Sequence, residues 1–216
     1  MLRRSAVVVL LAVLVPATVQ AFDHHHHSSR HSSGSGGGCS SHEASSPSVT
    51  SKPIPTPAGP SPKRVFVTST SYAGAIGSVK AADADCQAAA AAARLSGSFK
   101  AWISDSTTNA YDRTADVGPW YTTRGELAFS QKSDLRAGAP GTDLVDERGN
   151  PPSAAGAWSG TTTTGVASGN DCEGWTNASA GATASTGSAL GADTSWGGDD
   201  TPATCDATAS LICFQQ

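Results

Sequence analysis

Histidine is missing from most of this chain. All six histidines lie between residues 24 and 42, so residues 63–216 contain none. A Ser-His-Asp triad or a Cys–His pair needs an imidazole as general base, so neither can be assembled in that region. No glycine-rich motif opens a helix, which gives no support to nucleotide binding. These absences favour a protein that is not an enzyme.

Basic runs are absent as well. Residues 63–216 contain ten lysines and arginines against sixteen aspartates and glutamates, a net charge of −6. Binding to a phosphate backbone depends on clustered cations, and an acidic surface repels polyanions. We therefore expect no nucleic-acid partner.

The sequence has no apolar run long enough to span a bilayer. Its longest run near the start, Ala6 to Val15, is about half the roughly 20 residues that a spanning helix needs. Arg3 and Arg4 precede it and small residues follow up to Ala21, which predicts a secretory signal over residues 1–21. An uncleaved membrane anchor is the alternative. With the signal removed, we expect a secreted or surface-exposed chain without a membrane span.

Residues 22–62 are almost entirely Ser, Gly, His and Pro. Such a segment buries too little apolar surface to offset the entropy of folding, which predicts a disordered linker. It carries Cys39, the odd cysteine of five. The sequence leaves three roles open for Cys39: a free thiol, an intermolecular disulfide or a lipid attachment site.

A metal site is predicted at the start of the mature chain. Cleavage after Ala21 would leave Phe22, Asp23, His24 and His25 as the first residues. A free amine, backbone amides and a third-position imidazole form a nitrogen set suited to copper or nickel. A chance low-complexity tract, or an expression tag, is the alternative.

Residues 63–216 are predicted to form one α+β domain. Residues 64–69 are β-branched and aromatic, typical of a strand, and residues 99–104 predict a second one. Between them, Ser78 is a plausible N-cap of a helix that runs to about Leu95, with Gly97 as its stop. Gly, Ser, Thr, Asp and Pro dominate beyond residue 104, so long loops are expected as far as Ala157.

Four cysteines fall in this domain: Cys86, Cys172, Cys205 and Cys213. Export would place them where disulfides persist. Four cysteines allow three connectivities, and cysteines used in this way are structural, not nucleophilic.

Several blocks of this domain resemble the endostatin-type domain of collagens, within the C-type-lectin-like superfamily. The blocks occur in the same order as in that family and span nearly all of residues 63–216: residues 86–88, 94–104, 158–161, 172–176, 205 and 211–213. Bacterial secreted proteins carry related domains. The resemblance implies a C-type-lectin-like fold, with a helix packed on small antiparallel sheets and long loops. It also supports the nested pairing Cys86–Cys213 and Cys172–Cys205, which we expect.

Members of that superfamily that bind sugars through calcium carry a Glu-Pro-Asn or Gln-Pro-Asp triplet, and this chain has neither. Residues 196–200 match only partly the Trp-Asn-Asp motif that precedes the third cysteine of the frame. Asp199 and Asp200 are predicted calcium ligands, together with Asp171 or Glu173, because calcium binds several oxygens. Solvated loop acids are the alternative. The heparin binding of endostatins uses surface arginines, and the net charge of −6 argues against it here.

Aromatic residues supply the other candidate site. Trp102, Trp158 and Trp175 are expected in the core or against the disulfides. Trp120, Tyr121 and Trp196 fall in predicted loops, where exposed rings stack on sugar faces, so they are predicted to bind ligand. The adjacent acids at positions 146 and 147 are expected to be solvated.

The sequence therefore predicts a secreted, non-enzymatic binding or adhesion module that recognises an extracellular glycan or protein through its loops. Two alternatives stay open: a structural envelope or matrix component, and a carboxylate-dependent hydrolase. The oligomeric state is open as well.

Overall fold

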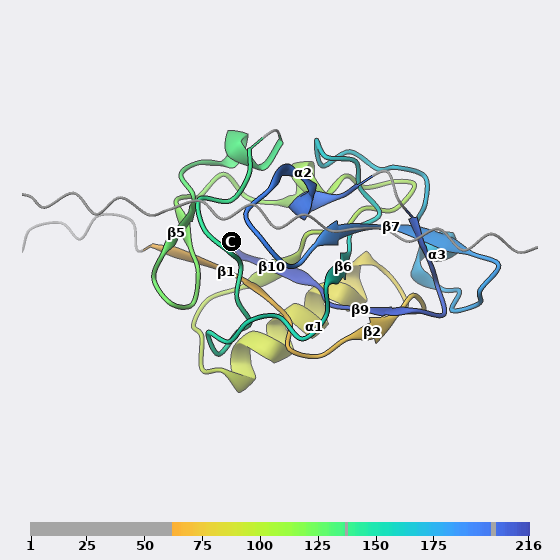
Figure 1. Ribbon diagram of the computed structural model, residues 1–216, viewed down its shortest axis with the longest axis horizontal. Coiled ribbons are helices and arrows are strands. Elements are labelled where there is room, and N and C mark those ends of the chain that lie inside the picture. The colour runs from red at the N-terminus through yellow and green to blue at the C-terminus, as the bar shows by residue number, and fades with distance from the viewer. Residues whose placement is uncertain (1–61, 137, 200–201) are drawn as a thin grey trace, which may run out of the picture. The chain divides into compact units, whose positions relative to one another are not determined.

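A computed structural model describes residues 62–136, 138–199 and 202–216 of the chain (Figure 1). The predicted signal, the linker with Cys39, and the metal site at Phe22, Asp23, His24 and His25 lie outside these residues. The described residues form a mixed α+β structure with short strands and few helices. None of the helices in these three ranges is both long and apolar enough to cross a membrane.

Short helices are interspersed among the strands along the described residues. In order they are β1 (Lys63–Val67), β2 (Tyr72–Ala73), α1 (Val79–Ala92), β3 (Phe99–Ala101), α2 (Ala110–Arg113), β4 (Trp120–Tyr121), β5 (Leu127–Phe129), the 3-10 helix η1 (Lys132–Arg136), β6 (Gly156–Trp158), α3 (Cys172–Trp175), β7 (Thr183–Ser188), the 3-10 helix η2 (Thr194–Gly197), β8 (Pro202–Thr204), β9 (Thr208–Ala209) and β10 (Ile212–Gln215). The second predicted strand is shorter than expected, ending at Ala101 instead of Ser104.

The strands form three small sheets. The largest has the order β3-β10-β1-β4-β5, and the others are β2-β9 and β6-β7-β8. The first strand, β1, pairs antiparallel with the last, β10, and parallel with β4. The two ends of the described domain therefore meet in the middle of one sheet, and the long loops extend between them.

Helix α1 follows the prediction closely. The Ser78 side chain accepts a hydrogen bond from the Ala81 amide at 3.1 Å and caps the helix, which ends at Ala92, a few residues before the expected end. Figure 1 shows α1 lying across the strands β1 and β10. Its buried face carries the small residues Cys86 and Ala90, which allow close packing on the sheet.

The same helix covers the open edge of β3. Gln87 Oε1 accepts a hydrogen bond from the Phe99 amide at 3.0 Å, and Asp83 Oδ1 accepts one from the Ala101 amide at 2.9 Å. An edge strand with unpaired amides is a template for unwanted strand pairing. Here helix side chains occupy two of those donors.

Two disulfides join distant segments. Cys86–Cys213 ties α1 to β10 and has a Cα–Cα distance of 5.6 Å. Cys172–Cys205 has a Cα–Cα distance of 5.8 Å. This is the nested pairing expected from the sequence. Two such crosslinks are typical of proteins that fold in an oxidising compartment.

Helix α3 is a turn of the left-handed kind. The φ angles of Cys172, Glu173, Gly174 and Trp175 are 52°, 56°, 69° and 65°. For residues other than glycine this hand costs roughly 1–2 kcal/mol each. The Cys172–Cys205 disulfide holds one end, and the buried Trp175 indole donates to Ser104 O at 2.8 Å at the other. Such strain persists only where the surrounding structure fixes it.

The buried side chains form two clusters. The helix-side core lies under α1 and contains both disulfides with Phe66, Trp158 and Trp175. The aromatic core is built on Trp102, Trp120, Phe129, Trp196 and Phe214. Trp102, Trp158 and Trp175 are thus buried, as the sequence predicts.

Candidate functional site

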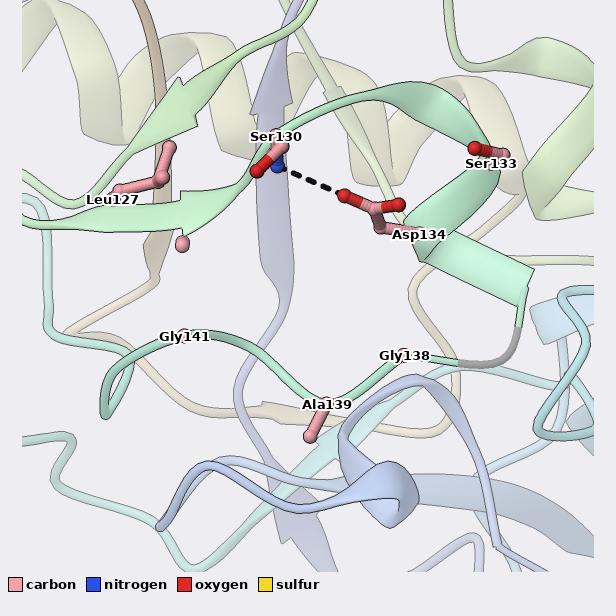
Figure 2. Close-up of a pocket in the computed structure, with 8 residues that line it drawn as sticks. Leu127, Ser130, Ser133, Asp134, Gly138, Ala139 and Gly141 are labelled. Atoms are coloured by element: carbon pink, nitrogen blue, oxygen red, sulfur yellow. Dashed lines mark hydrogen bonds between the residues drawn. The ribbon is translucent and has the colours of Figure 1, made fainter.

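A cavity of about 440 Å³ opens beside β5, the edge strand of the largest sheet. Figure 2 shows the β5–η1 segment on one side of it and the chain from Gly138 to Gly141 on the other. Its volume lies within the range of small-molecule and cofactor sites. It is lined by Leu127, Ala128, Ser130, Ser133, Asp134, Gly138, Ala139 and Gly141.

Asp134 shapes the polar wall of this cavity. Its Oδ2 accepts hydrogen bonds from the amides of Ser130 at 3.0 Å and Gln131 at 3.2 Å. These bonds fix the turn that leads from β5 into η1, as a capping carboxylate does at a helix start. The wall therefore presents a carboxylate in a set position beside the hydroxyls of Ser130 and Ser133 (Figure 2).

Two glycines let the opposite wall, formed by residues 138–141, come close to β5 and η1. The Gly141 amide donates to Ala128 O at 2.8 Å, and the Gly138 amide donates to Asp134 O at 2.9 Å. A Cβ atom at position 141 would lie 2.8 Å from Leu127 O, and one at position 138 would lie 2.8 Å from Asp134 O. A larger residue at either position would push the two walls apart.

Trp196 supports this wall from the core, and the expectation that it is an exposed ligand platform is wrong. The side chain is 1% exposed, and its Nε1 donates to Gly138 O at 2.9 Å. Its ring centroid lies 4.7 Å from that of Phe129 and 4.9 Å from that of Trp102. The large apolar indole is buried with other rings, and its single donor holds the cavity wall.

Trp120 is buried too, so its predicted role in stacking on a ligand is also wrong. It lies in β4, not in a loop, and its Nε1 donates to Gln215 O at 2.8 Å. Successive residues of a strand point to opposite faces. The next residue, Tyr121, is therefore half-exposed, and it lines a second cavity of about 330 Å³ with Pro62, Arg64, Pro119 and Gly125.

The acids at positions 146 and 147 are not solvated, contrary to the expectation. Asp146 and Glu147 are 5% and 4% exposed. Asp146 Oδ1 accepts hydrogen bonds from the amides of Arg148 and Asn150 at 2.8 and 2.7 Å. Glu147 accepts from the Ser69 amide at 2.8 Å, from its hydroxyl at 2.5 Å and from the Arg148 guanidinium at 2.8 Å. Both carboxylates are thus engaged in holding loops together.

The predicted calcium ligands do not converge in the part of the chain that is described. Asp171 accepts from the amides of Ser106 and Gly174, and Glu173 accepts from the Asn177 side chain. The Asp199 amide donates to Thr186 O at 2.8 Å, and Asp200 lies outside the described residues. Over residues 62–136, 138–199 and 202–216, no three or more His, Cys, Asp or Glu side chains gather where they could hold a metal ion.

Sequence reasoning missed Ser130, Ser133 and Asp134. Two signals point to their neighbourhood: the apolar island at residues 127–129, and the long loops expected between Ser104 and Ala157. Neither signal places Asp134 opposite Ala139, because that arrangement depends on how the loop folds back on β5.

Chemically, the cavity offers a carboxylate, two hydroxyls, main-chain groups and one large apolar side chain, Leu127, which is 42% exposed. These groups can accept and donate hydrogen bonds to a polyhydroxylated ligand while Leu127 contacts its apolar faces. No protein-family model matches the chain, and no curated protein matches it.

Proposed function

We propose that the chain is an exported, non-enzymatic binding module, and that it holds an extracellular polysaccharide in the cavity between β5, η1 and residues 138–141. The observation that carries the proposal is the construction of this cavity. Its polar wall is fixed by the Asp134 carboxylate, and its opposite wall is held by the Trp196 indole. A preorganised wall lowers the entropy that binding would otherwise lose in ordering the site.

The proposed fold is C-type-lectin-like. Three features support it: the antiparallel pairing of β1 with β10, the crosslink between α1 and β10, and a second crosslink that closes a loop between them. A frame of this kind leaves long loops outside the strands, and binding residues are often found on loops held by a rigid scaffold. Export is supported by the two disulfides and by the predicted signal.

The lining favours a sugar over a protein as ligand. Protein interfaces concentrate their binding energy in pockets that receive large aromatic or aliphatic anchors. This cavity has small residues and hydroxyls over most of its wall, and among the described residues that line it Leu127 is the only large apolar one. Hydroxyls and a carboxylate match the donors and acceptors of a sugar ring.

The test is a binding screen of the full, oxidised chain. Immobilised neutral oligosaccharides derived from cellulose, chitin and mannan are compared with anionic ones derived from alginate and hyaluronan. We expect binding to at least one neutral series and a loss of roughly tenfold or more in affinity for Asp134→Asn, which corresponds to about 1.4 kcal/mol.

Asp105→Asn is the matched control. Asp105 Oδ1 accepts from the Thr107 amide at 2.8 Å and so holds the turn at residues 105–108 much as Asp134 holds the start of η1, but it does not line the cavity. Equal losses in the two variants, or no binding to any of the neutral or anionic series, would overturn the proposed function. Depolymerisation of the bound glycan would favour the hydrolase alternative.

A further inference from the structure

Three side chains form a row across the sheet between the two cavities. In the strand register, Arg64 of β1 pairs with Tyr121 of β4, and Tyr121 pairs with Leu127 of β5. Neighbouring strands lie about 4.8 Å apart, so the row spans roughly 10 Å. Arg64 and Tyr121 line the 330 Å³ cavity, and Leu127 lines the 440 Å³ cavity. The row therefore connects the two cavities.

A β-bulge turns Leu127 toward this row. The register shifts by one residue between the pair Trp120–Phe129 and the pair Tyr121–Leu127. Ala128 and Phe129 are both buried as a result, and Leu127 is left 42% exposed opposite Tyr121. Bulges commonly redirect a side chain in this way next to functional sites. Without the shift, strict alternation would put Leu127 on the buried face with Phe129.

The part of the row formed by Arg64 and Tyr121 is firmly held. Arg64 Nη1 donates to Thr122 O at 3.0 Å, and the Arg64 amide donates to Gln215 Oε1 at 2.9 Å. The first bond ties the guanidinium to the start of the turn that follows β4, and the second ties the main chain of β1 to the Gln215 side chain of β10. The half-exposed Tyr121 ring lies among Pro62, Pro119 and Gly125, which gives it a rigid, largely apolar surround.

We propose that the Tyr121 cavity is a second subsite for the same ligand, and that the ligand is a linear, uncharged polysaccharide that crosses β5 and β4. This inference rests on the proposed function and specifies its ligand. One sugar unit is held by Asp134 and the serines, the chain passes over Leu127, and a further unit stacks on Tyr121. Stacking suits an uncharged ring, since aromatic faces contact the apolar faces of sugars.

Charge sets the choice of polymer. The domain has a net charge of −6, the first subsite contains a carboxylate, and the turn that links β4 to β5 exposes Glu126 close to Arg124. The net negative charge and the carboxylate of the first subsite would repel a polyanionic chain, whereas an uncharged chain would meet no such repulsion. Arg64 is the single cation of the row and serves as a hydrogen-bond donor to hydroxyl oxygens at its end.

The test compares ligand length. Dissociation constants are measured for disaccharides and hexasaccharides derived from cellulose, chitin and mannan, with the full oxidised chain. We expect the hexasaccharide of the bound series to bind roughly tenfold tighter than its disaccharide. Tyr121→Leu should remove that gain in affinity while leaving disaccharide affinity unchanged. Tyr121→Phe should keep the gain, because the aromatic ring is kept.

Leu127→Ala is compared with Leu190→Ala. The two leucines are 42% and 48% exposed, and only Leu127 lies in the row. We expect the hexasaccharide to lose affinity in the first variant alone. Equal affinity for the two lengths, or a length gain that survives Tyr121→Leu, would overturn this inference and leave the proposed function standing. Tighter binding of polyproline than of any hexasaccharide would replace the glycan by a peptide. Binding of an anionic series with no binding of any neutral sugar would overturn this inference alone, and failure of every sugar to bind would overturn the proposed function itself.

Discussion

The helix-side core and the aromatic core are stabilised in different ways. The helix-side core contains both disulfides and packs small alanines of α1 against the sheet. The aromatic core contains no cysteine and consists of close ring contacts. The ring centroid of Phe214 lies within 5.8 Å of the ring centroids of Trp102, Trp120, Phe129 and Trp196. The first region depends on covalent crosslinks, and the second depends on buried apolar surface.

The difference matters because the candidate site belongs to the second region. Trp196 joins the aromatic core to the cavity wall through Gly138. A crosslink stabilises mainly by restricting the unfolded chain, whereas ring packing stabilises the native state directly. Changes on the helix side should therefore alter stability with little change in ligand affinity, and changes on the aromatic side should alter both.

The largest effect is expected for the Cys86–Cys213 crosslink. It closes a separation of 127 residues, for which the chain-entropy account gives about 5 kcal/mol. Cys86→Ala with Cys213→Ala should lower the free energy of unfolding by about that amount in urea titrations. Oligosaccharide affinity, measured where the variant is still folded, should stay within about twofold.

The Cys172–Cys205 crosslink makes this comparison sharper. Its separation of 33 residues gives about 4 kcal/mol in the same account. Its removal also lets the left-handed turn at residues 172–175 relax, which returns part of that loss. We expect a net cost clearly below that of the first pair. A larger cost for this pair would contradict the chain-entropy reasoning.

The next largest effect is expected for two buried indoles of the aromatic core, which differ in their contact with the site. Trp196→Phe and Trp120→Phe each remove one indole hydrogen bond to a main-chain oxygen, to Gly138 and Gln215 respectively. Each should cost about 2 kcal/mol of stability, since both leave an unpaired carbonyl and a small void. Only Trp196→Phe should weaken oligosaccharide binding, because only Trp196 holds the cavity wall. Equal binding by the two variants would break the link between this core and the site.

The helix side was more predictable from sequence than the aromatic side, for a physical reason. The Ser78 cap, the α1 helix and its small buried face follow from local propensity and spacing. Trp120 and Trp196 stand among glycines, serines and acids, so their surroundings suggest exposed loops. Their burial depends on contacts between segments distant in sequence, such as Trp196 with Phe129 and Phe214. The cavity was missed for the same reason, since its two walls meet only through tertiary packing.

Asp146 and Glu147 show the same limit for polar residues. Adjacent acids in a loop are usually solvated, and no local pattern marks these two as different. Glu147 is buried against Ser69, and Asp146 forms a β-bridge with Val67, and both of these partners lie far away in the sequence. Composition supplies the number of charges but not which of them become part of the framework.

The smallest effect is a pH dependence confined to the helix side. Burial, followed by the negative charges of Asp85 and Glu147, raises the pKa of Tyr72 from 10.0 to about 12. A phenol with a pKa higher in the folded than in the unfolded chain contributes stability that is complete below pH 10 and is lost as pH rises toward 12. The free energy of unfolding should therefore fall over this range in the native chain, and the fall should be shallower in Tyr72→Phe.

Two further measurements test the cause of that shift. Asp85→Asn removes one of the two carboxylates, so it should lower the pKa of Tyr72 in an ultraviolet titration of the phenolate. Because burial is the larger cause, the pKa in that variant should still lie above 10.0. Oligosaccharide affinity should not change in either variant, since Tyr72 packs against the helix-side core and does not line the cavity beside β5. A change in affinity with Tyr72→Phe would show that the two cores are coupled, and would end the separation between the region that is crosslinked and the region that binds.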